Sequence, residues 1–364
     1  MKVLHILYSG LGGHGNVFFS MVDADKEKKL KQEALFFGIE EIREGYIENA
    51  NARNIPWYFV KKKPGLDFSS YRQIRTIIKR SAPDIIFIHG GCYIYPAKRA
   101  AIASSKKMKI VVRETKPNHL KTRQDWLGLV FSLLVAHKVV FLSNEYKEAI
   151  RKKFSLFFSK KRTAVIPNGI DLDAYKPHPK KKDEFIKIGM QSRLSATKDH
   201  ATLIKAFHLC LQKNPTEKNL RLFIAGEGEC KPGLEALTKE LKIEDKIVFT
   251  GMLEEKDLIE FINSLNIYVH ASLGETMSTA IMQVMACQLP IIASDVLGVN
   301  NMIKHNSNGI LVPAADEQEL ANAILYLLNN PDTAAKLAAA AYDFAINNYS
   351  NSIMLERYKA VFAE

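Results

Sequence analysis

The regular alternation of short apolar runs with helical patterns is the feature that most constrains the fold of this chain. Runs such as 2–8 (KVLHILY) and 84–89 (DIIFIH) have the length and apolar character of buried strands. Segments with helical spacing, for example 69–81, lie between them. Because parallel strands need a crossover connection that is usually a helix, this alternation predicts a parallel sheet covered by helices on both faces.

A polar segment interrupts the alternation, and the pattern then starts again. Residues 176–184 (KPHPKKKDE) contain two prolines and a run of lysines, and strand-like and helical segments follow them. A chain of 364 residues exceeds the size at which one hydrophobic core keeps growing. We therefore predict an α/β protein of two Rossmann-like, doubly wound domains, 1–178 and 179–348.

Cysteines and apolar segments argue against several classes of protein. The four cysteines have no paired spacing, which indicates free thiols in a reducing cytoplasm and no metal cage. The apolar run 2–8 is too short for the core of a signal peptide. No apolar run reaches the roughly 18 residues that span a bilayer. These features predict a cytoplasmic protein without a spanning segment and without a metal.

Charge is distributed unevenly between the two halves. Residues 1–180 contain 33 Lys+Arg and 16 Asp+Glu, a net charge of +17, whereas the remaining residues contain 18 and 23, a net charge of −5. Such asymmetry favours an anionic partner for the first half, although abundant solvated lysines explain it equally well. The basic residues are spread over several elements and no nucleic-acid motif occurs, so we expect no nucleic-acid partner.

A glycine-rich turn follows the first predicted strand. Residues 8–16 (YSGLGGHGN) have glycines at which the backbone can approach a phosphate beside the start of a helix. The order of glycines is not that of a dinucleotide-binding fingerprint, and no acidic residue ends the second strand. A tight turn without a ligand is the alternative interpretation.

Two basic residues follow the first predicted strand of the second half. Arg193 and Lys198 lie where open α/β sheets bind ligands, outside the carboxyl end of a strand. A guanidinium and an ammonium group there can clamp a diphosphate and stabilise the charge that grows on it as it leaves. Ion pairs with Asp199 or Glu227 on an exposed loop are the alternative.

The segment 271–295 (ASLGETMSTAIMQVMACQLPIIASD) places a lone acid before an apolar helix. Glu275 can accept hydrogen bonds from sugar hydroxyls, and Ser278 or Thr279 is a plausible N-cap whose helix start can hold phosphate oxygens. The amide of Gln283 can bind a ribose diol, although a polar position on an otherwise apolar helix explains this residue as well.

Five motifs occur in an order that resembles the family 4 retaining glycosyltransferases of the GT-B fold. They are VIPNGID (165–171), SRLSATKD (192–199), IAGEGE (224–229), VFTGML (248–253) and GETMSTAIMQVMACQLPIIASD (274–295). The resemblance implies two domains facing across a cleft, with a C-terminal helix (349–364) that crosses back to the first domain. It also implies a nucleotide-diphosphate sugar bound mainly by the second domain and an acceptor bound by the first.

The resemblance assigns roles to individual residues. Arg193 and Lys198 match the basic pair that grips the diphosphate, and Glu275 matches the first acid of the family's E-x7-E motif, which contacts the donor sugar. Gln283 stands where the second acid usually binds ribose. Further donor contacts are implied for Gly12, Gly13, Gly226, Gly228, Met252, Leu253, Met277, Ser278 and Thr279.

The chain departs from the family pattern in three places. Gln283 replaces an acid, and ETMS (275–278) replaces the usual EGFG. The histidine that many members carry after a first-domain strand is not obvious, because Thr115 stands there and His119 follows. We take His119 as the candidate near the reacting hydroxyl. Residues 113–126 are either an acceptor loop, in which Trp126 stacks on a sugar, or the start of an amphipathic helix. The candidate acceptor contacts are His119, Lys121, Arg123 and Trp126.

A basic and aromatic segment, 151–162 (RKKFSLFFSKKR), has two interpretations. Lysines attract anionic lipid and aromatic rings enter the headgroup boundary, which predicts membrane contact. The rings can instead close the core while the lysines are solvated. The candidate membrane contacts are Lys152, Lys153, Phe157, Phe158, Lys160 and Lys161.

The resemblance, together with the candidate site residues, implies a metal-independent, retaining hexosyltransferase without a cofactor. The expected donor is a nucleotide-diphosphate sugar, with UDP favoured, and the acceptor is a hydroxyl of a glycan or a lipid-linked saccharide. The expected setting is bacterial cell-surface polysaccharide or lipopolysaccharide biosynthesis, in the cytoplasm or at the inner face of its membrane. The alternatives are a nucleotide-sugar epimerase of the same fold and an inactive homologue that acts as a scaffold.

Overall fold

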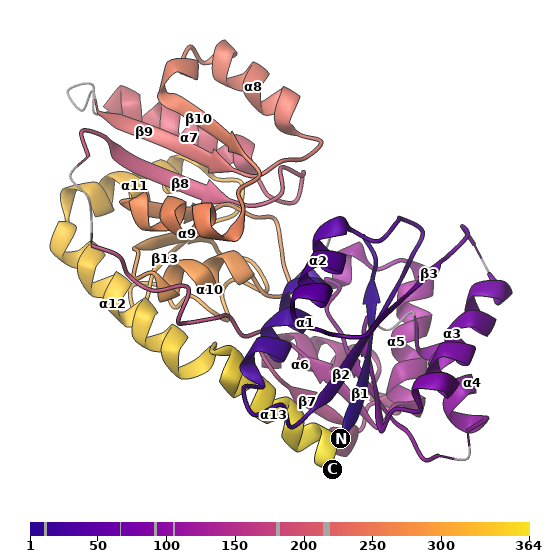
Figure 1. Cartoon of the computed structure of the whole chain (residues 1–364). Helices are drawn as coiled ribbons and strands as arrows, with labels where there is room; N and C mark the ends of the chain where they lie inside the picture. Colours follow the sequence, from indigo (N-terminus) through magenta and orange to yellow (C-terminus); the bar gives the residue numbers. More distant parts are fainter. Residues whose placement is uncertain (11–12, 66, 91–92, 105, 180–182, 214–218) are drawn as a thin grey trace. The chain divides into compact units, whose positions relative to one another are not determined.

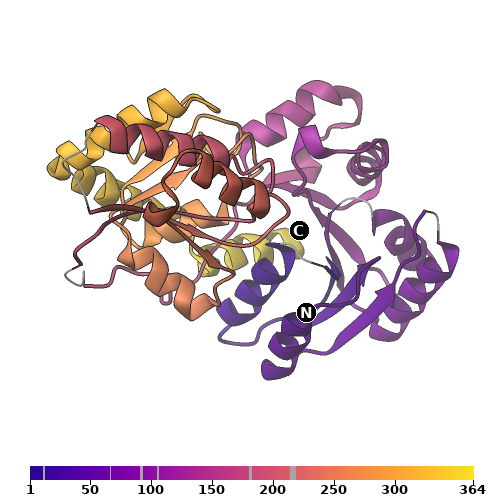
Figure 2. The same ribbon diagram turned by 90° about the horizontal axis from the view of Figure 1, so that it is seen from above.

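The computed structural model of the chain describes residues 1–364 except 11–12, 66, 91–92, 105, 180–182 and 214–218. Contacts divide it into two compact units, Met1–Gly169 with Asn351–Glu364, and Ile170–Ser350 (Figure 1). Each unit is a parallel sheet with helices on both faces, as Figure 2 shows from above. The prediction of two Rossmann-like α/β units is therefore confirmed. Within the described part of the chain, no helix is long and apolar enough to cross a bilayer.

The first unit contains a seven-stranded sheet in the order β3-β2-β1-β4-β5-β6-β7. Its strands are β1 (Lys2–Tyr8), β2 (Lys31–Gly38), β3 (Trp57–Lys61), β4 (Ile85–His89), β5 (Lys109–Arg113), β6 (Lys138–Phe141) and β7 (Thr163–Val165). Its helices are α1 (Gly13–Ala24), α2 (Glu44–Ala52), α3 (Phe68–Ser81), α4 (Ile94–Ile102), α5 (Arg123–Val135), α6 (Asn144–Lys153) and α13 (Asn351–Ala363). Short 3-10 turns are η2 (Asn118–Leu120), η3 (Ser155–Phe157) and η4 (Lys160–Arg162).

The C-terminal helix α13 completes the core of the first unit. It contacts α1, and its aromatic residues pack against the central strand β4. The ring centroid of Phe87 lies 4.9 Å from that of Tyr358 and 5.5 Å from that of Phe362. All three side chains are buried. The C-terminal helix is therefore part of the first unit. The apolar face of this helix covers the sheet, which would otherwise expose Phe87.

The second unit contains a six-stranded sheet in the order β10-β9-β8-β11-β12-β13. Its strands are β8 (Ile186–Gln191), β9 (Leu220–Ala225), β10 (Ile247–Gly251), β11 (Ile267–His270), β12 (Ile291–Ser294) and β13 (Ile310–Val312). Its helices are α7 (His200–Lys213), α8 (Lys231–Glu240), α9 (Glu255–Ser264), α10 (Thr279–Ala286), α11 (Glu317–Asn329) and α12 (Pro331–Asn348), and η5 (Glu244–Lys246) is a short 3-10 turn.

The strand order of the second unit reverses at β8. This strand pairs with β9 on one side and with β11, which comes later in the chain, on the other. Because all strands are parallel, their carboxyl ends meet at one edge of the sheet, and ligands of such sheets bind at this switch point. The loops that follow β8 and β11 are therefore neighbours although more than seventy residues separate them.

Candidate active site

Two loops of the second unit are joined by hydrogen bonds at the switch point. The loop after β8 contains Lys198, and the loop after β11 contains Glu275. The backbone N–H of Leu273 donates to the carbonyl of Thr197 at 2.9 Å, and the Ser272 hydroxyl donates to the same carbonyl at 3.3 Å. This double contact fixes the two loops relative to each other.

Lys198 and Glu275 form an ion pair across these loops. Lys198 Nζ contacts Glu275 Oε1, and His270 Nε2 lies 2.5 Å from the same oxygen. The exposed fraction of the side chain is 22% for Lys198 and 9% for Glu275. Burial alone would raise the pKa of Glu275, but the positive charges and hydrogen bonds of His270 and Lys198 outweigh it and hold the pKa well below its usual range. Glu275 is therefore a carboxylate at neutral pH.

His270 is the residue that orients Glu275, and the sequence did not single it out. It is fully buried at the end of β11. Its Nδ1 lies 3.2 Å from the Tyr268 hydroxyl, which donates to the carbonyl of Gln191 at 3.3 Å. Each ring nitrogen of His270 therefore has an oxygen atom as its partner. The sequence could have identified His270, because a histidine there ends an apolar strand directly before the loop that contains Glu275.

Arg193 lies on the same edge of the sheet and points outward. Its side chain is exposed, and it has no ion-pair partner among the described residues. The ion pairs considered from the sequence, with Asp199 or Glu227, do not form within the described part of the chain: Glu227 pairs with Lys231 at 2.8 Å, and Lys198 pairs with Glu275. The exposed guanidinium group of Arg193 is therefore available to an anionic ligand, in addition to the partly exposed Lys198.

Gly226 and Gly228 hold the Arg193 loop against β9. A Cβ atom on Gly226, where φ is +136°, would lie 2.0 Å from the Ser192 carbonyl oxygen, and one on Gly228 would lie 2.3 Å from the Leu194 oxygen. The backbone N–H of Leu194 donates to the Glu227 carbonyl at 3.0 Å. These glycines are therefore required by close backbone approach. Their predicted contact with the donor stays a prediction.

Gly298 has the same role for the Glu275 loop, and the sequence did not single it out. Its φ is +88°, and a Cβ atom there would lie 2.2 Å from the carbonyl oxygen of Glu275. The backbone N–H of Glu275 donates to the carbonyl of Leu297 at 3.1 Å. The connection after β12 therefore supports the loop from behind and leaves no room for a side chain.

The helix α10 begins beside Glu275. Ser278 is its N-cap, with its hydroxyl accepting from the Ile281 N–H, as predicted. The Ser278 hydroxyl also lies 3.2 Å from His270 Nε2. Gln283 accepts a hydrogen bond from the Gln191 side chain at 2.9 Å. Its amide oxygen is thus held within the protein, and its contact with ribose stays a prediction.

The remaining predicted donor contacts occupy three places. Met277 and Thr279 flank the N-cap of α10 and are partly buried. Met252 is exposed and Leu253 partly buried, directly after β10. Gly12 lies outside the described residues, and Gly13 begins α1. Within the described ranges, no group of three His, Cys, Asp or Glu side chains could hold a metal ion.

The predicted acceptor residues lie in the first unit, where Lys121 is buried. Its ammonium group pairs with buried Glu114 at 3.3 Å and lies 5.2 Å from the ring centroid of Trp126. The other cation over Trp126 is Lys153, at 3.8 Å. Lys121 is therefore the counter-ion of Glu114, and the Trp126 ring packs among protein side chains. Arg123 is exposed at the start of α5, and the side chain of His119 lies outside what the structure describes.

A buried polar cluster at the carboxyl ends of β4 and β5 was not predicted. His89 Nε2 lies 3.2 Å from His5 Nδ1, and His89 Nδ1 lies 3.5 Å from a guanidinium nitrogen of Arg113. Burial, followed by the charge of Arg113, lowers the pKa of His89 far below its usual value, so this ring is neutral at neutral pH. Arg113 also donates to Asn168. The sequence could have identified this cluster, because polar residues end two adjacent apolar strands.

The candidate membrane residues divide between core and surface. Phe158 packs into the core of the first unit, with its ring centroid 6.4 Å from that of Phe141. Phe157 is 38% exposed. The lysines of the segment, Lys152, Lys153, Lys160 and Lys161, are all exposed. Phe158 therefore fits the core interpretation, and membrane contact by the exposed residues stays a prediction.

The two units together have the GT-B fold, and solved structures with this fold match the whole length of the chain. HepE from Anabaena, in complex with UDP, gives a TM-score of 0.82 at 18% identity and covers 100% of both chains. The apo form of the lipopolysaccharide outer core galactosyltransferase WaaB gives a TM-score of 0.76 at 18% identity, covering 100% of this chain and 99% of its own. At these identities the likeness concerns the fold.

Family models specify the class further. Residues 172–344 match the model described as glycosyl transferases group 1, and residues 28–174 match the model described as glycosyltransferase family 4. The chain belongs to the family 4 glycosyltransferases, as the order of its five motifs predicted.

Three relatives show how far the similarity extends. The lipopolysaccharide core biosynthesis glycosyltransferase LpsD of Rhizobium meliloti is 25% identical over 366 residues, covering 100% of this chain and 98% of LpsD. Alpha-D-kanosaminyltransferase of Streptomyces kanamyceticus is 28% identical over 40% of this chain and 38% of its own length. Alpha-monoglucosyldiacylglycerol synthase of Streptococcus pneumoniae is 26% identical over 57% of this chain and 49% of its own length. The chain thus spans less than half of the last two proteins.

Proposed function

We propose that the protein transfers a hexose from a nucleotide-diphosphate sugar to a hydroxyl group of a glycan or lipid-linked saccharide, with retention of the anomeric configuration. The observation that carries this proposal is the arrangement at Glu275. Lys198 and His270 both contact Oε1, whereas Oε2 has no hydrogen-bond partner among the described residues. An oriented carboxylate with one oxygen available is suited to accept a hydrogen bond from a sugar hydroxyl.

The cations of the same site are suited to stabilise the negative charge of the leaving diphosphate. Breaking the bond between the anomeric carbon and the diphosphate leaves negative charge on the diphosphate, and fixed cations stabilise that charge most in the transition state. Exposed Arg193 and partly exposed Lys198 can supply this stabilisation without a metal. As the acceptor oxygen bonds to the anomeric carbon, its proton passes to the departing phosphate oxygen on the same face. The step balances without a cofactor.

The relatives support a donor and a setting. HepE has been solved with UDP and with UDP-glucose. LpsD, a glycosyltransferase of lipopolysaccharide core biosynthesis, matches over 98% of its length. A UDP-linked donor and an acceptor in cell-surface polysaccharide or lipopolysaccharide biosynthesis are therefore our proposal for this chain. The cytoplasm, where nucleotide sugars are available, is the proposed location.

Thermal stabilisation by nucleotides tests the donor site. Ligand binding to the folded state raises its stability by RT ln(1 + [L]/Kd), and the melting temperature rises with it. We expect UDP or its sugar conjugate to raise the melting temperature of the wild type, and expect the rise to disappear in Arg193→Ala. GDP and ADP serve as comparison ligands. No rise with any nucleotide would reject the site and favour the scaffold alternative, and conversion of a nucleotide sugar without an acceptor would favour the epimerase.

A further inference from the structure

An exposed apolar surface lies on α5 and the neighbouring turn η3. The exposed fraction is 93% for Leu156, 70% for Leu127, 46% for Leu134 and 38% for Phe157. Leu127 and Leu134 are seven residues apart on α5 and so lie on one face of this helix. The turn η3, which contains Leu156 and Phe157, packs against α5. We call these four residues the α5–η3 patch.

The local structure holds Leu156 outward. Phe154 and Phe158, on either side of η3, are packed against the core of the first unit. The guanidinium group of Arg162, directly after this segment, donates to the carbonyl of Leu134 at 2.6 Å, which ties the segment to α5. With two aromatic anchors inside and a hydrogen bond at its end, the turn presents Leu156 and Phe157 to solvent. This exposure is therefore a property of an anchored turn.

Exposed lysines flank the η3 part of the patch on both sides in the sequence. Lys152 and Lys153 precede η3 and Lys160 and Lys161 follow it, and all four are exposed. No aspartate or glutamate occurs between Glu148 and Asp171. The nearest preceding acid, Glu148, is paired with Arg151 at 2.6 Å. The charges that flank η3 in the sequence, from Arg151 to Arg162, are thus all positive.

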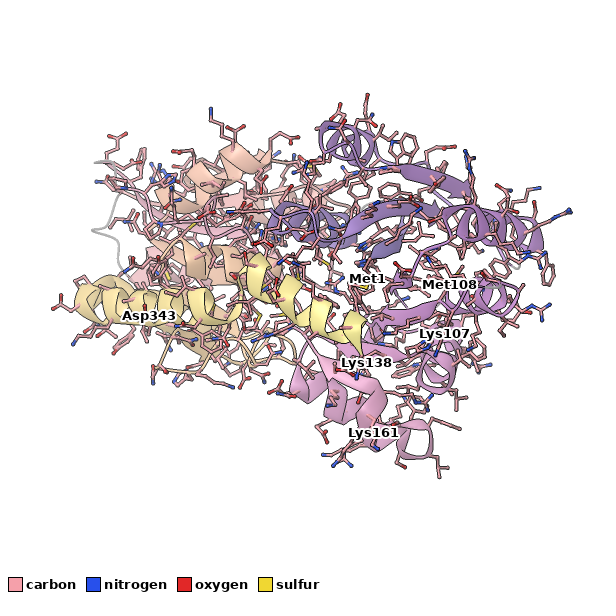
Figure 3. All side chains as sticks on the ribbon, turned by 60° about the horizontal axis from the view of Figure 1, so that its bottom comes forward. Met1, Lys107, Met108, Lys138, Lys161 and Asp343 are labelled. Carbon is pink, nitrogen blue, oxygen red and sulfur yellow. The ribbon has the colours of Figure 1, made fainter. Side chains whose placement is uncertain are left out.

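The positive field continues beyond the patch. His137 follows α5, and burial together with the charges of Lys98, Lys109 and Lys107 lowers its pKa. In Figure 3, Lys107 lies beside Met108, and Lys161 lies at the lower edge of the same unit. A surface that combines outward apolar side chains with cations matches an anionic bilayer, whose headgroups attract lysines and whose boundary accepts apolar side chains.

We propose that the α5–η3 patch docks the first unit onto a bilayer surface that contains anionic lipid. Leu156 and Phe157 enter the boundary between headgroups and acyl chains. Lys152, Lys153, Lys160 and Lys161 contact the lipid phosphates. This proposal does not depend on the proposed glycosyl transfer, because docking needs neither donor nor acceptor.

A second copy of the chain fits the patch less well. In a two-fold symmetric contact each patch would face its own copy, so the four lysines would meet like charges. The patch also has only four apolar side chains, whereas a stable interface buries about 1,200 Å² or more. A nucleic acid would use the lysines but would leave Leu156 and Phe157 exposed. The bilayer is the partner that uses both kinds of side chain.

Co-sedimentation with vesicles tests the proposal, using the full chain without donor or acceptor. We expect binding to vesicles of phosphatidylglycerol with phosphatidylcholine, little binding to phosphatidylcholine alone, and release at raised ionic strength. Leu156→Asp should weaken binding by about tenfold or more, because a charge replaces an inserted apolar group. The double variant Lys160→Glu with Lys161→Glu should weaken it similarly.

Matched controls lie on α3 of the same unit. Phe68 is 71% exposed, so Phe68→Asp makes the same kind of change away from the patch, and Arg72→Glu with Lys79→Glu reverses two other exposed charges. These controls should bind as the wild type does. Binding that is absent in the wild type, or equal in Leu156→Asp and Phe68→Asp, would overturn the proposal. Self-association without vesicles that Leu156→Asp abolishes would assign the patch to a second copy and would also overturn it.

Discussion

Glu275 Oε1 and His270 Nε2 lie 2.5 Å apart, and this contact defines the candidate active site. His270 ends β11 with no exposed side-chain surface, and Glu275 lies five residues later in the loop. The buried ring therefore provides a rigid support for a carboxylate whose other oxygen can receive a ligand. A strand end is a precise place for such a support, because the sheet fixes its backbone.

Replacing His270 tests this support. In His270→Gln, Glu275 loses a positive charge and a hydrogen bond that lower its pKa, so its pKa should rise. We expect kcat to fall by about tenfold or more, the usual scale for a misplaced catalytic group. The acidic limb of the pH–rate profile should also move to higher pH. If the role of His270 is purely structural, His270→Gln should give less folded enzyme, and the acidic limb of its pH–rate profile should stay at the wild-type pH.

The Glu275 carboxylate should make stability depend on pH. Its pKa in the folded protein lies below the ordinary value of 4.5, so its contribution is fully present above about 4.5, where the unfolded chain has also lost the proton. That contribution is lost as the pH falls from there towards the folded-state pKa. Urea unfolding should therefore show a larger difference in free energy between wild type and Glu275→Gln at pH 7 than at pH 3.5. An equal difference at both values would contradict the assigned direction of the shift.

Gly226 should be intolerant of a side chain. In Gly226→Ala the new Cβ atom would lie 2.0 Å from the Ser192 oxygen at a φ of +136°, so the loop that contains Arg193 must move. We expect a loss of about 2 kcal/mol or more in the free energy of unfolding, together with weaker nucleotide binding. Gly233→Ala is the control, because a Cβ atom at this position in α8 meets nothing within 4 Å. The control should stabilise the protein by up to about 1 kcal/mol.

Lys121 should contribute more to the stability of the protein than to binding of the acceptor. In Lys121→Met, Glu114 remains buried without its ion-pair partner, and breaking such a pair costs about 3–5 kcal/mol. Burial already raises the pKa of Glu114, and the loss of Lys121 should raise it further, so Glu114 of the variant should take up a proton on folding. The stability difference between the variant and the wild type should therefore be smaller at low pH than at neutral pH. Arg123→Ala, at an exposed neighbouring position, should leave the melting temperature unchanged. If both variants unfold at the wild-type temperature, Lys121 has no structural role and the acceptor assignment gains support.

The sequence by itself determined the parts of this protein that depend on neighbours along the chain. Alternating apolar and helical segments predicted two parallel sheets, and the loops after two strands identified Arg193, Lys198 and Glu275 as candidates. The start of α10 was correctly predicted at Ser278 or Thr279, and Ser278 is the N-cap, because capping involves residues only three positions apart. Five motifs in order were sufficient for the family.

Only the tertiary structure decided which side chains meet. Lys198 pairs with Glu275 because β8 lies beside β11, a strand order that local periodicity does not encode. The same strand pairing gives buried His270 its place between Tyr268 and Glu275. The sequence made Lys121 a candidate acceptor contact, yet the fold buries its side chain against Glu114. Burial and ion pairing are set by contacts between residues far apart in the chain, and these exist only once the sheets and their loops have packed.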